Sequence, residues 1–218
     1  MKVLGLSCSP RKMGNTQILV DEALAGAEKE GAEVELISLS GKEIKPCDGC
    51  LACANTGKCR IKDDMQTVYP KLVAADGIIF GAPVYFYGMA SQAKALIDRT
   101  YALRHPNFRL VSKVAGVITV AGNLGRVDVL KDLYFYIAIN HMIPADFVAA
   151  NASEKGAIRQ DEKAMKMAWE LGREMVQLVG TGFKFPDEFK NRFSNYVTSK
   201  YKLDELPASA QNRTKLTA

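Results

Sequence analysis

Four cysteines within one short stretch are the residues of this chain best suited to chemistry. Residues 47–59 read CDGCLACANTGKC, so the four thiols have the spacing C-x2-C-x2-C-x5-C. Thiolates are the soft ligands that iron-sulfur clusters and zinc select. The stretch is therefore a candidate metal site, with the ligands Cys47, Cys50, Cys53 and Cys59.

The spacing of these cysteines bears on which metal they would bind. Structural zinc sites usually take two cysteine pairs that are separated by about a dozen or more residues. Two consecutive x2 steps instead favour a ferredoxin-type [4Fe-4S] cluster, although Arg60 stands where a ferredoxin has a proline. No second set of cysteines exists, so all four would serve one cluster. Zinc, and free or disulfide-bonded thiols, stay open as alternatives.

Basic residues flank the cysteines, namely Lys45, Lys58, Arg60 and Lys62. Such charges could favour a reduced cluster or attract an acidic partner such as a ferredoxin. The alternative is an ordinary solvated basic loop.

A second candidate site is the segment 7–16, which reads SCSPRKMGNT and lies between an expected strand and an expected helix. Backbone N–H groups at such a position form an anion site, and the segment adds hydroxyl and amide donors and the charge of Arg11. The pattern is neither a Walker lysine loop nor G-x-G-x-x-G, which weighs against an ATPase and a Rossmann dehydrogenase. A phosphate monoester site is favoured over a generic capped turn. We expect Cys8 to be a small buried residue rather than a ligand or nucleophile.

The elements that must position these sites alternate between strand and helix. The expected strands are residues 3–6, 34–39, 77–81, 114–120 and 145–150. Helices are expected from residue 15 or 16, over 64–75, through Ala93 to Tyr101, through Leu130 to Ile137, and through Ala164 to Leu178. Asp63 should cap the second helix, and Pro70 should kink or split it. The cysteine loop is then an insertion between a strand and its crossover helix.

Five β-α repeats predict an α/β fold with a doubly wound, flavodoxin-like parallel sheet of strand order 2-1-3-4-5. Ligands bind such sheets outside the carboxyl ends of the strands, at the topological switch point. Residues 1–180 would form this domain, with the loop 45–62 inserted. Residues 181–218 would be a C-terminal extension carrying an amphipathic helix with Phe185, Phe189, Phe193 and Tyr196, followed by a polar end over 207–218. This aromatic stripe would either pack on its own domain or wrap another subunit.

Composition narrows the function classes. The 218 residues are 48% hydrophobic, which suffices for one sizeable core. The net charge of +5 is mild and does not form the basic stripe of a nucleic-acid binder. No apolar run approaches the roughly 18 residues of a membrane span, and residues 3–6 are too short for a signal peptide. We therefore expect a soluble, cytoplasmic protein without nucleic-acid or membrane partners.

Three of these motifs together resemble the NADPH-dependent FMN reductase superfamily. They are the S-x-R-x-x-G-N-T pattern of residues 9–16, the PVYFYG stretch of residues 83–88, and the loop of residues 121–126. The cysteine run, followed by the sequence KDDM at residues 62–65, further resembles the iron-sulfur flavoproteins of anaerobic microbes. The likeness covers residues 1–180, and the cysteine loop is its most specific part.

The resemblance implies two cofactors, FMN and a [4Fe-4S] cluster. It assigns the FMN phosphate to Ser9, Arg11, Asn15 and Thr16, and the flavin ring and ribityl chain to Pro83, Val84, Tyr85, Phe86, Tyr87 and Gly88. It places Gly122 and Asn123 near the polar edge of the ring, and Cys47, Cys50, Cys53 and Cys59 on the cluster. The alternative for the aromatic run is a hydrophobic plug at a strand end. No catalytic acid-base pair is expected, because flavin itself supplies the redox step.

The leading hypothesis is an electron-transfer flavoprotein that takes electrons from a ferredoxin-like carrier and passes them to a small acceptor. The first alternative is an NAD(P)H-dependent flavin or quinone reductase whose cysteines bind zinc or nothing. The second is a non-catalytic interaction module that uses the metal loop and the aromatic tail. The resemblance also implies a homo-oligomer, a dimer or a tetramer.

Overall fold

The computed structural model describes residues 1–190. Met1–Phe183 form one compact unit, and a second unit begins at Lys184. Within the second unit, α8 covers Asp187–Lys190, where the tail helix was predicted to begin. The rest of that predicted helix, with Phe193 and Tyr196, and the polar end 207–218 lie outside the described residues.

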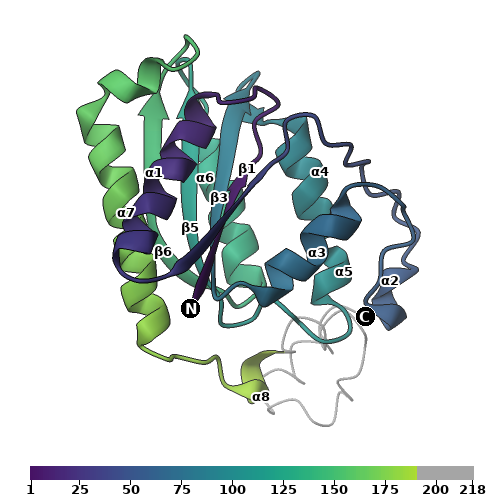
Figure 1. Ribbon diagram of the computed structural model, residues 1–218. Coiled ribbons are helices and arrows are strands. Elements are labelled where there is room, and N and C mark those ends of the chain that lie inside the picture. The colour runs from purple at the N-terminus through teal and green to yellow at the C-terminus, as the bar shows by residue number, and fades with distance from the viewer. Residues whose placement is uncertain (191–218) are drawn as a thin grey trace, which may run out of the picture. The chain divides into compact units, whose positions relative to one another are not determined.

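A parallel sheet forms the centre of the first unit. Its five parallel strands are β1 (Lys2–Ser7), β2 (Glu33–Ser38), β3 (Gly77–Tyr85), β5 (Val114–Ala121) and β6 (Ile143–Asn151). They lie in the order β2-β1-β3-β5-β6, which is the predicted order once β4 is left out (Figure 1). The short strand β4 (Gly88–Met89) was not predicted, and it pairs with the end of β3 in an antiparallel hairpin.

Helices cover both faces of the sheet. The first face carries α1 (Asn15–Lys29) and α7 (Glu162–Gly180), and the second carries α3 (Met65–Ala74), α4 (Ser91–Arg99) and α6 (Arg126–Ile139) (Figure 1). Every residue of β5 is buried, as a parallel strand requires when both faces are covered. The remaining helical turns are α2 (Cys53–Thr56), α5 (Tyr101–Arg104) and η1 (Ala157–Gln160). No helix among residues 1–190 has the length and apolarity to cross a bilayer.

Two glycines allow α1 and α7 to come into backbone contact. A Cβ atom added at Gly26 would lie 2.0 Å from the carbonyl oxygen of Trp169, and one added at Gly172 would lie 1.8 Å from that of Ala23. Neither distance is physically possible for a real side chain, so glycine is required at both positions.

Two helix predictions need correction. Pro70 does not split its helix, since α3 continues through it as one helix, and the alternative of a kink at Pro70 stays a prediction. The helix predicted through Ala93 to Tyr101 instead ends at Arg99, and a separate turn begins at Tyr101, whose side chain is exposed. At this break, the Thr100 hydroxyl donates to the Ile97 carbonyl at 2.6 Å and accepts from the Tyr136 hydroxyl at 2.9 Å. These side-chain bonds accompany the end of the regular helix.

Candidate functional site

A cavity of about 540 Å³ lies at the carboxyl ends of the parallel strands. Its walls come from the loop after β1, the end of β3, the end of β5 and the loops after β5 and β6, which is the switch point of the sheet. The lining residues are Ser9, Arg11, Asn15, Thr16, Pro83, Val84, Tyr85, Phe86, Val120, Gly122, Ala152 and Ser153. The volume falls within the range of about 300 to 1,000 Å³ that is usual for small-molecule and cofactor sites.

The cavity brings together most of the residues that were expected at a cofactor. All the predicted cofactor residues except Tyr87, Gly88 and Asn123 line it. Ala152 and Ser153 also line it, although they were not predicted. They directly follow β6, so the rule that sites form at the carboxyl ends of strands could have found them.

The loop after β1 is folded tightly around the N-terminus of α1. The backbone N–H of Arg11 donates to the Ser9 hydroxyl at 3.2 Å, and that of Gly14 donates to the Arg11 carbonyl at 3.2 Å. Gly14 is the N-cap of α1, so no side chain caps the first turn of this helix. The first N–H groups of a helix have no partner within the helix and carry its positive dipole end. This end of the cavity is therefore suited to an anion, with Arg11 as an additional positive charge.

Asn15, which was predicted at the FMN phosphate, lines the cavity beside this loop. Its side-chain nitrogen donates to the carbonyls of Ala152 and Glu154 at 3.3 and 2.8 Å, and its side-chain oxygen accepts from the N–H of Gly156 at 2.8 Å. The amide is thus committed to the loop after β6. Asn15 therefore joins two walls of the cavity.

The aromatic residues of the β3–β4 hairpin form its turn. Phe86 and Tyr87 connect the paired residues Tyr85 and Gly88, and both have positive φ angles of 45° and 65°. Two such residues in a two-residue hairpin correspond to a type I′ turn. Phe86 is 98% exposed and Tyr87 is also exposed, so the interpretation of these two rings as a buried plug is wrong.

The cysteine loop lies between β2 and α3, on the side of α5 away from the sheet centre (Figure 1). Cys47 and Cys50 are exposed, Cys59 is half-buried, and Cys53 is buried at the start of α2. Gly57 ends this turn with a left-handed φ of 64°, and its N–H donates to the Cys53 carbonyl at 2.8 Å. All four thiols are free.

The four thiols are close enough to affect one another. Burial raises the pKa of the Cys53 thiol, and the nearby charges of Cys59, Cys47 and Cys50 raise it further. In number and softness this donor set fits an iron-sulfur cluster or zinc. Across residues 1–190, however, no three His, Cys, Asp or Glu side chains converge to ligate a metal.

Two of the four basic residues near the cysteines have acidic partners. Lys45 Nζ lies 3.4 Å from a carboxylate oxygen of Glu43, and Arg60 pairs with Asp48. The other two, Lys58 and Lys62, line a small pocket of about 230 Å³ beside Cys59. The described residues that line this pocket include Arg109 and no acidic residue, so positive charge is concentrated there.

Cys8, the fifth cysteine, is buried directly after β1, as predicted. Burial raises the pKa of its thiol to about 12. At about pH 8 only about one Cys8 in ten thousand would be a thiolate, which is the reactive form. We expect iodoacetamide to modify Cys47 and Cys50 in metal-free protein and to leave Cys8 intact, as measured by peptide mass spectrometry. Labelling of Cys8 at a similar rate would contradict the burial of this residue.

Comparison with known proteins agrees with this architecture. The NADPH-dependent FMN reductase family matches residues 1–157. An iron-sulfur flavoprotein of Methanocaldococcus jannaschii is 39% identical over 189 residues, which cover 82% of this chain and 97% of that protein. An iron-sulfur flavoprotein of Methanosarcina thermophila is 40% identical over 186 residues, covering 82% and 95%. The crystal structure of RosB matches with a TM-score of 0.72 at 18% identity, covering 95% of this chain and 90% of that one.

A doubly wound sheet in this order, with its cavity at the switch point, defines a flavodoxin-like protein. The sequence relatives narrow the assignment, because they match over most of this chain and of their own length. The chain belongs to the iron-sulfur flavoproteins within the NADPH-dependent FMN reductase family.

Proposed function

We propose that this protein is an electron-transfer flavoprotein that binds FMN in the switch-point cavity and a [4Fe-4S] cluster at the four cysteines. Electrons would come from a ferredoxin-like carrier and pass to a small acceptor. The observation that carries the proposal is that a single chain contains both a cofactor-sized cavity with an anion-binding end and a compact loop of four free thiols. A bound flavin would exchange one or two electrons and a bound cluster one.

The cavity residues would divide the binding of FMN among them. The hydroxyls of Ser9 and Thr16, the guanidinium of Arg11 and the first N–H groups of α1 would hold the phosphate. Residues 83–86 would line the ring and ribityl chain. Gly122 lies on the opposite wall, where a Cβ atom would come within 3.2 Å of the Ser153 hydroxyl. Tyr87, Gly88 and Asn123 lie just beyond the lining and would be outer neighbours of the ring.

The cluster would be bound by Cys47, Cys50, Cys53 and Cys59. Cys53 is anchored by α2, whereas Cys47 and Cys50 are exposed and would have to turn toward it. An acidic electron donor would dock near Lys58, Lys62 and Arg109, because opposite charges steer association and fix orientation.

We also infer a homo-oligomer. Large apolar side chains are exposed on α6 and on the loop before it, namely Leu124, Val127 and Phe135. Exposed apolar groups of this kind are typical of surfaces that another protein covers. Measuring the mass of the protein in solution by light scattering would test this, and a monomer would contradict it.

The experiment that tests the function is the visible spectrum of protein purified without oxygen, together with its iron, sulfide and zinc content. We expect flavin bands over a broad absorbance, with about four irons and four sulfides per chain. Reduced ferredoxin should bleach both chromophores. Flavin bands with zinc or without metal would contradict the cluster.

One observation favours a second candidate, an NAD(P)H-dependent FMN or quinone reductase with zinc or nothing at the cysteines. The thiols of the described chain are not arranged as a ready metal site. Rapid oxidation of NADPH by iron-free, FMN-loaded protein would favour this candidate over the first.

A further inference from the structure

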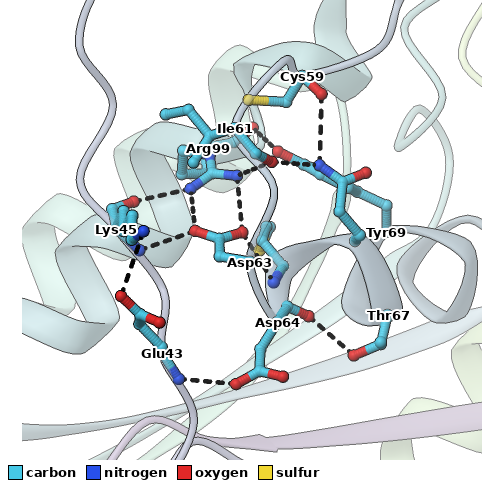
Figure 2. Close-up of polar contacts among 11 residues, drawn as sticks. Glu43, Lys45, Cys59, Ile61, Asp63, Asp64, Thr67, Tyr69 and Arg99 are labelled. Carbon is cyan, nitrogen blue, oxygen red and sulfur yellow. Dashed lines mark hydrogen bonds and ion pairs between the residues drawn. The ribbon is translucent and has the colours of Figure 1, made fainter.

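A buried ion pair lies at the base of the cysteine loop (Figure 2). The guanidinium of Arg99, at the end of α4, meets the carboxylate of Asp63 through two contacts, Nη1–Oδ2 at 2.6 Å and Nη2–Oδ1 at 3.0 Å. Both side chains are 0% exposed. Such a two-point contact fixes the orientation of both partners as well as their distance.

The same two side chains bond to the backbone on both arms of the loop. On the arm before the cysteines, the N–H of Lys45 donates to Asp63 Oδ2 at 2.8 Å, and Arg99 Nη1 donates to the Lys45 carbonyl at 2.8 Å. On the arm after them, Arg99 Nη2 approaches the Ile61 carbonyl at 3.4 Å. The ion pair therefore joins the chain two residues before Cys47 to the chain two residues after Cys59 (Figure 2).

A second pair of bonds reinforces this closure. The N–H of Glu43 donates to Asp64 Oδ2 at 2.7 Å, and the N–H of Asp64 donates back to the Glu43 carbonyl at 3.1 Å. Nearer the cysteines, the side-chain amide of Gln66 donates to the carbonyls of Cys59 and Ile61 at 3.3 and 2.6 Å. Cys59 is thus positioned from α3, while its arm is held from α4.

Asp63 was predicted to cap α3, and the structure corrects this. The N-cap of α3 is Asp64, and the Asp63 side chain accepts one bond from the helix, from the N–H of Met65 at 3.1 Å, while the Asp63 carbonyl accepts from the N–H of Gln66 at 3.1 Å. Burial alone would raise the pKa of the Asp63 carboxyl, but the bonds from Arg99 and Lys45 outweigh this and leave it below its ordinary value of 3.8. Asp63 therefore stays charged at neutral pH, and its contribution to stability is lost only as the pH falls through that lowered pKa.

Stability alone does not explain why charges are buried here. Removing two charges from water costs free energy, and well-packed apolar residues often serve as well or better. Arg99 Nε, moreover, has no hydrogen-bond partner among residues 1–190. What the pair provides, and apolar side chains could not, is a set of directed bonds to the carbonyls and N–H groups on either side of the cysteines.

We propose that Asp63 and Arg99 are positioning residues of the metal site: they close the base of the cysteine loop before metal arrives, so that Cys47 and Cys59 are held near each other and the thiols need only turn to reach a common centre. The proposal rests on the proposed function only in requiring that the four thiols bind a metal, whichever metal that is. Outer groups that orient ligands typically affect metal affinity by roughly 10- to 100-fold.

The test is a titration of the metal-free full-length protein with cobalt(II). The thiolate-to-cobalt absorbance measures how much cobalt is bound. We expect Asp63→Asn and Arg99→Met to weaken cobalt binding by roughly 10- to 100-fold and to leave FMN affinity unchanged. Arg99→Lys should bind cobalt as weakly as Arg99→Met, because one ammonium group cannot span both oxygens of Asp63 and the carbonyls of Lys45 and Ile61. Cobalt affinity equal to wild type in these variants would overturn the proposal.

Two further variants separate positioning from general destabilisation. Val176→Ala removes buried volume on the opposite face of the sheet, and it should lower the melting temperature without changing cobalt affinity. If it weakened cobalt binding as much as Arg99→Met, the proposal would fail. Asp63→Leu combined with Arg99→Met leaves no unpaired charge, so it should fold and still bind cobalt weakly. If the wild-type protein bound cobalt but contained zinc instead of iron, the proposed iron-sulfur cluster would be refuted. The positioning role of Asp63 and Arg99 would not be.

Discussion

Replacing Gly172 with alanine is expected to destabilise the folded protein severely. The new Cβ atom would lie 1.8 Å from the carbonyl oxygen of Ala23 and 2.8 Å from the backbone nitrogen of Ala27. Both obstacles are backbone atoms of α1, so no side-chain rotation can relieve the clash, and α1 and α7 would have to separate. Ordinary overpacking costs about 1 to 3 kcal/mol. We expect a larger loss, of about 4 kcal/mol or more, in urea denaturation followed by circular dichroism.

The matched control is Gly180→Ala, at the last residue of the same helix. No atom of residues 1–190 lies within 4 Å of the Cβ position there. We expect the free energy of unfolding to change by no more than about 0.5 kcal/mol, as is usual for open surface sites. If Gly172→Ala were as stable as this control, the close contact between α1 and α7 would be wrong.

Replacing Cys53 with serine is expected to remove the metal and to leave FMN in place. Cys53 is the most deeply buried of the four thiols, and a serine hydroxyl is a poor, hard substitute for a soft thiolate ligand. None of the residues that line the large cavity belongs to the loop 45–62, so the flavin site should not depend on it. Iron analysis and the flavin absorbance of the same sample measure the two outcomes separately.

Cys8→Ser is the control for the loss of a thiol as such. Cys8 is buried away from the other cysteines in sequence, and we expect this variant to keep both iron and FMN. If Cys53→Ser lost the flavin together with the iron, the cysteine loop would also contribute to the flavin pocket, and the two sites would not be separate.

Much of the fold and of the large cavity could be predicted from local patterns. The strand order followed from five apolar runs separated by helical periodicity, because parallel strands with right-handed crossovers allow few arrangements. Ser9, Arg11 and Thr16 were found at the cavity because the loop after the first strand must lie at the switch point.

The features that the sequence did not reveal depend on contacts between distant segments. Gly26 and Gly172 look like weak positions in helices, and only the crossing of α1 and α7 shows that any side chain is excluded. Asp63 and Arg99 are 36 residues apart, and no periodicity links them. Asn15 was predicted as a ligand donor from its place in the first loop. Its bonds to the loop after β6 span 137 residues or more, so the local sequence could not reveal them.

The turn of the β3–β4 hairpin has a consequence for the motions of the protein. Left-handed backbone at a residue other than glycine costs of order 1 kcal/mol or more, and here Phe86 and Tyr87 bear it together. In the described part of the chain, two residue pairs and the bond from the Ala90 N–H to the Pro83 carbonyl hold the hairpin closed, and the side chains at its tip are exposed. Local opening should therefore need little free energy, and backbone amides there should exchange with deuterium sooner than those of the buried strands. A ligand that covers Phe86 would slow that exchange. This wall of the cavity would then become ordered when the ligand binds.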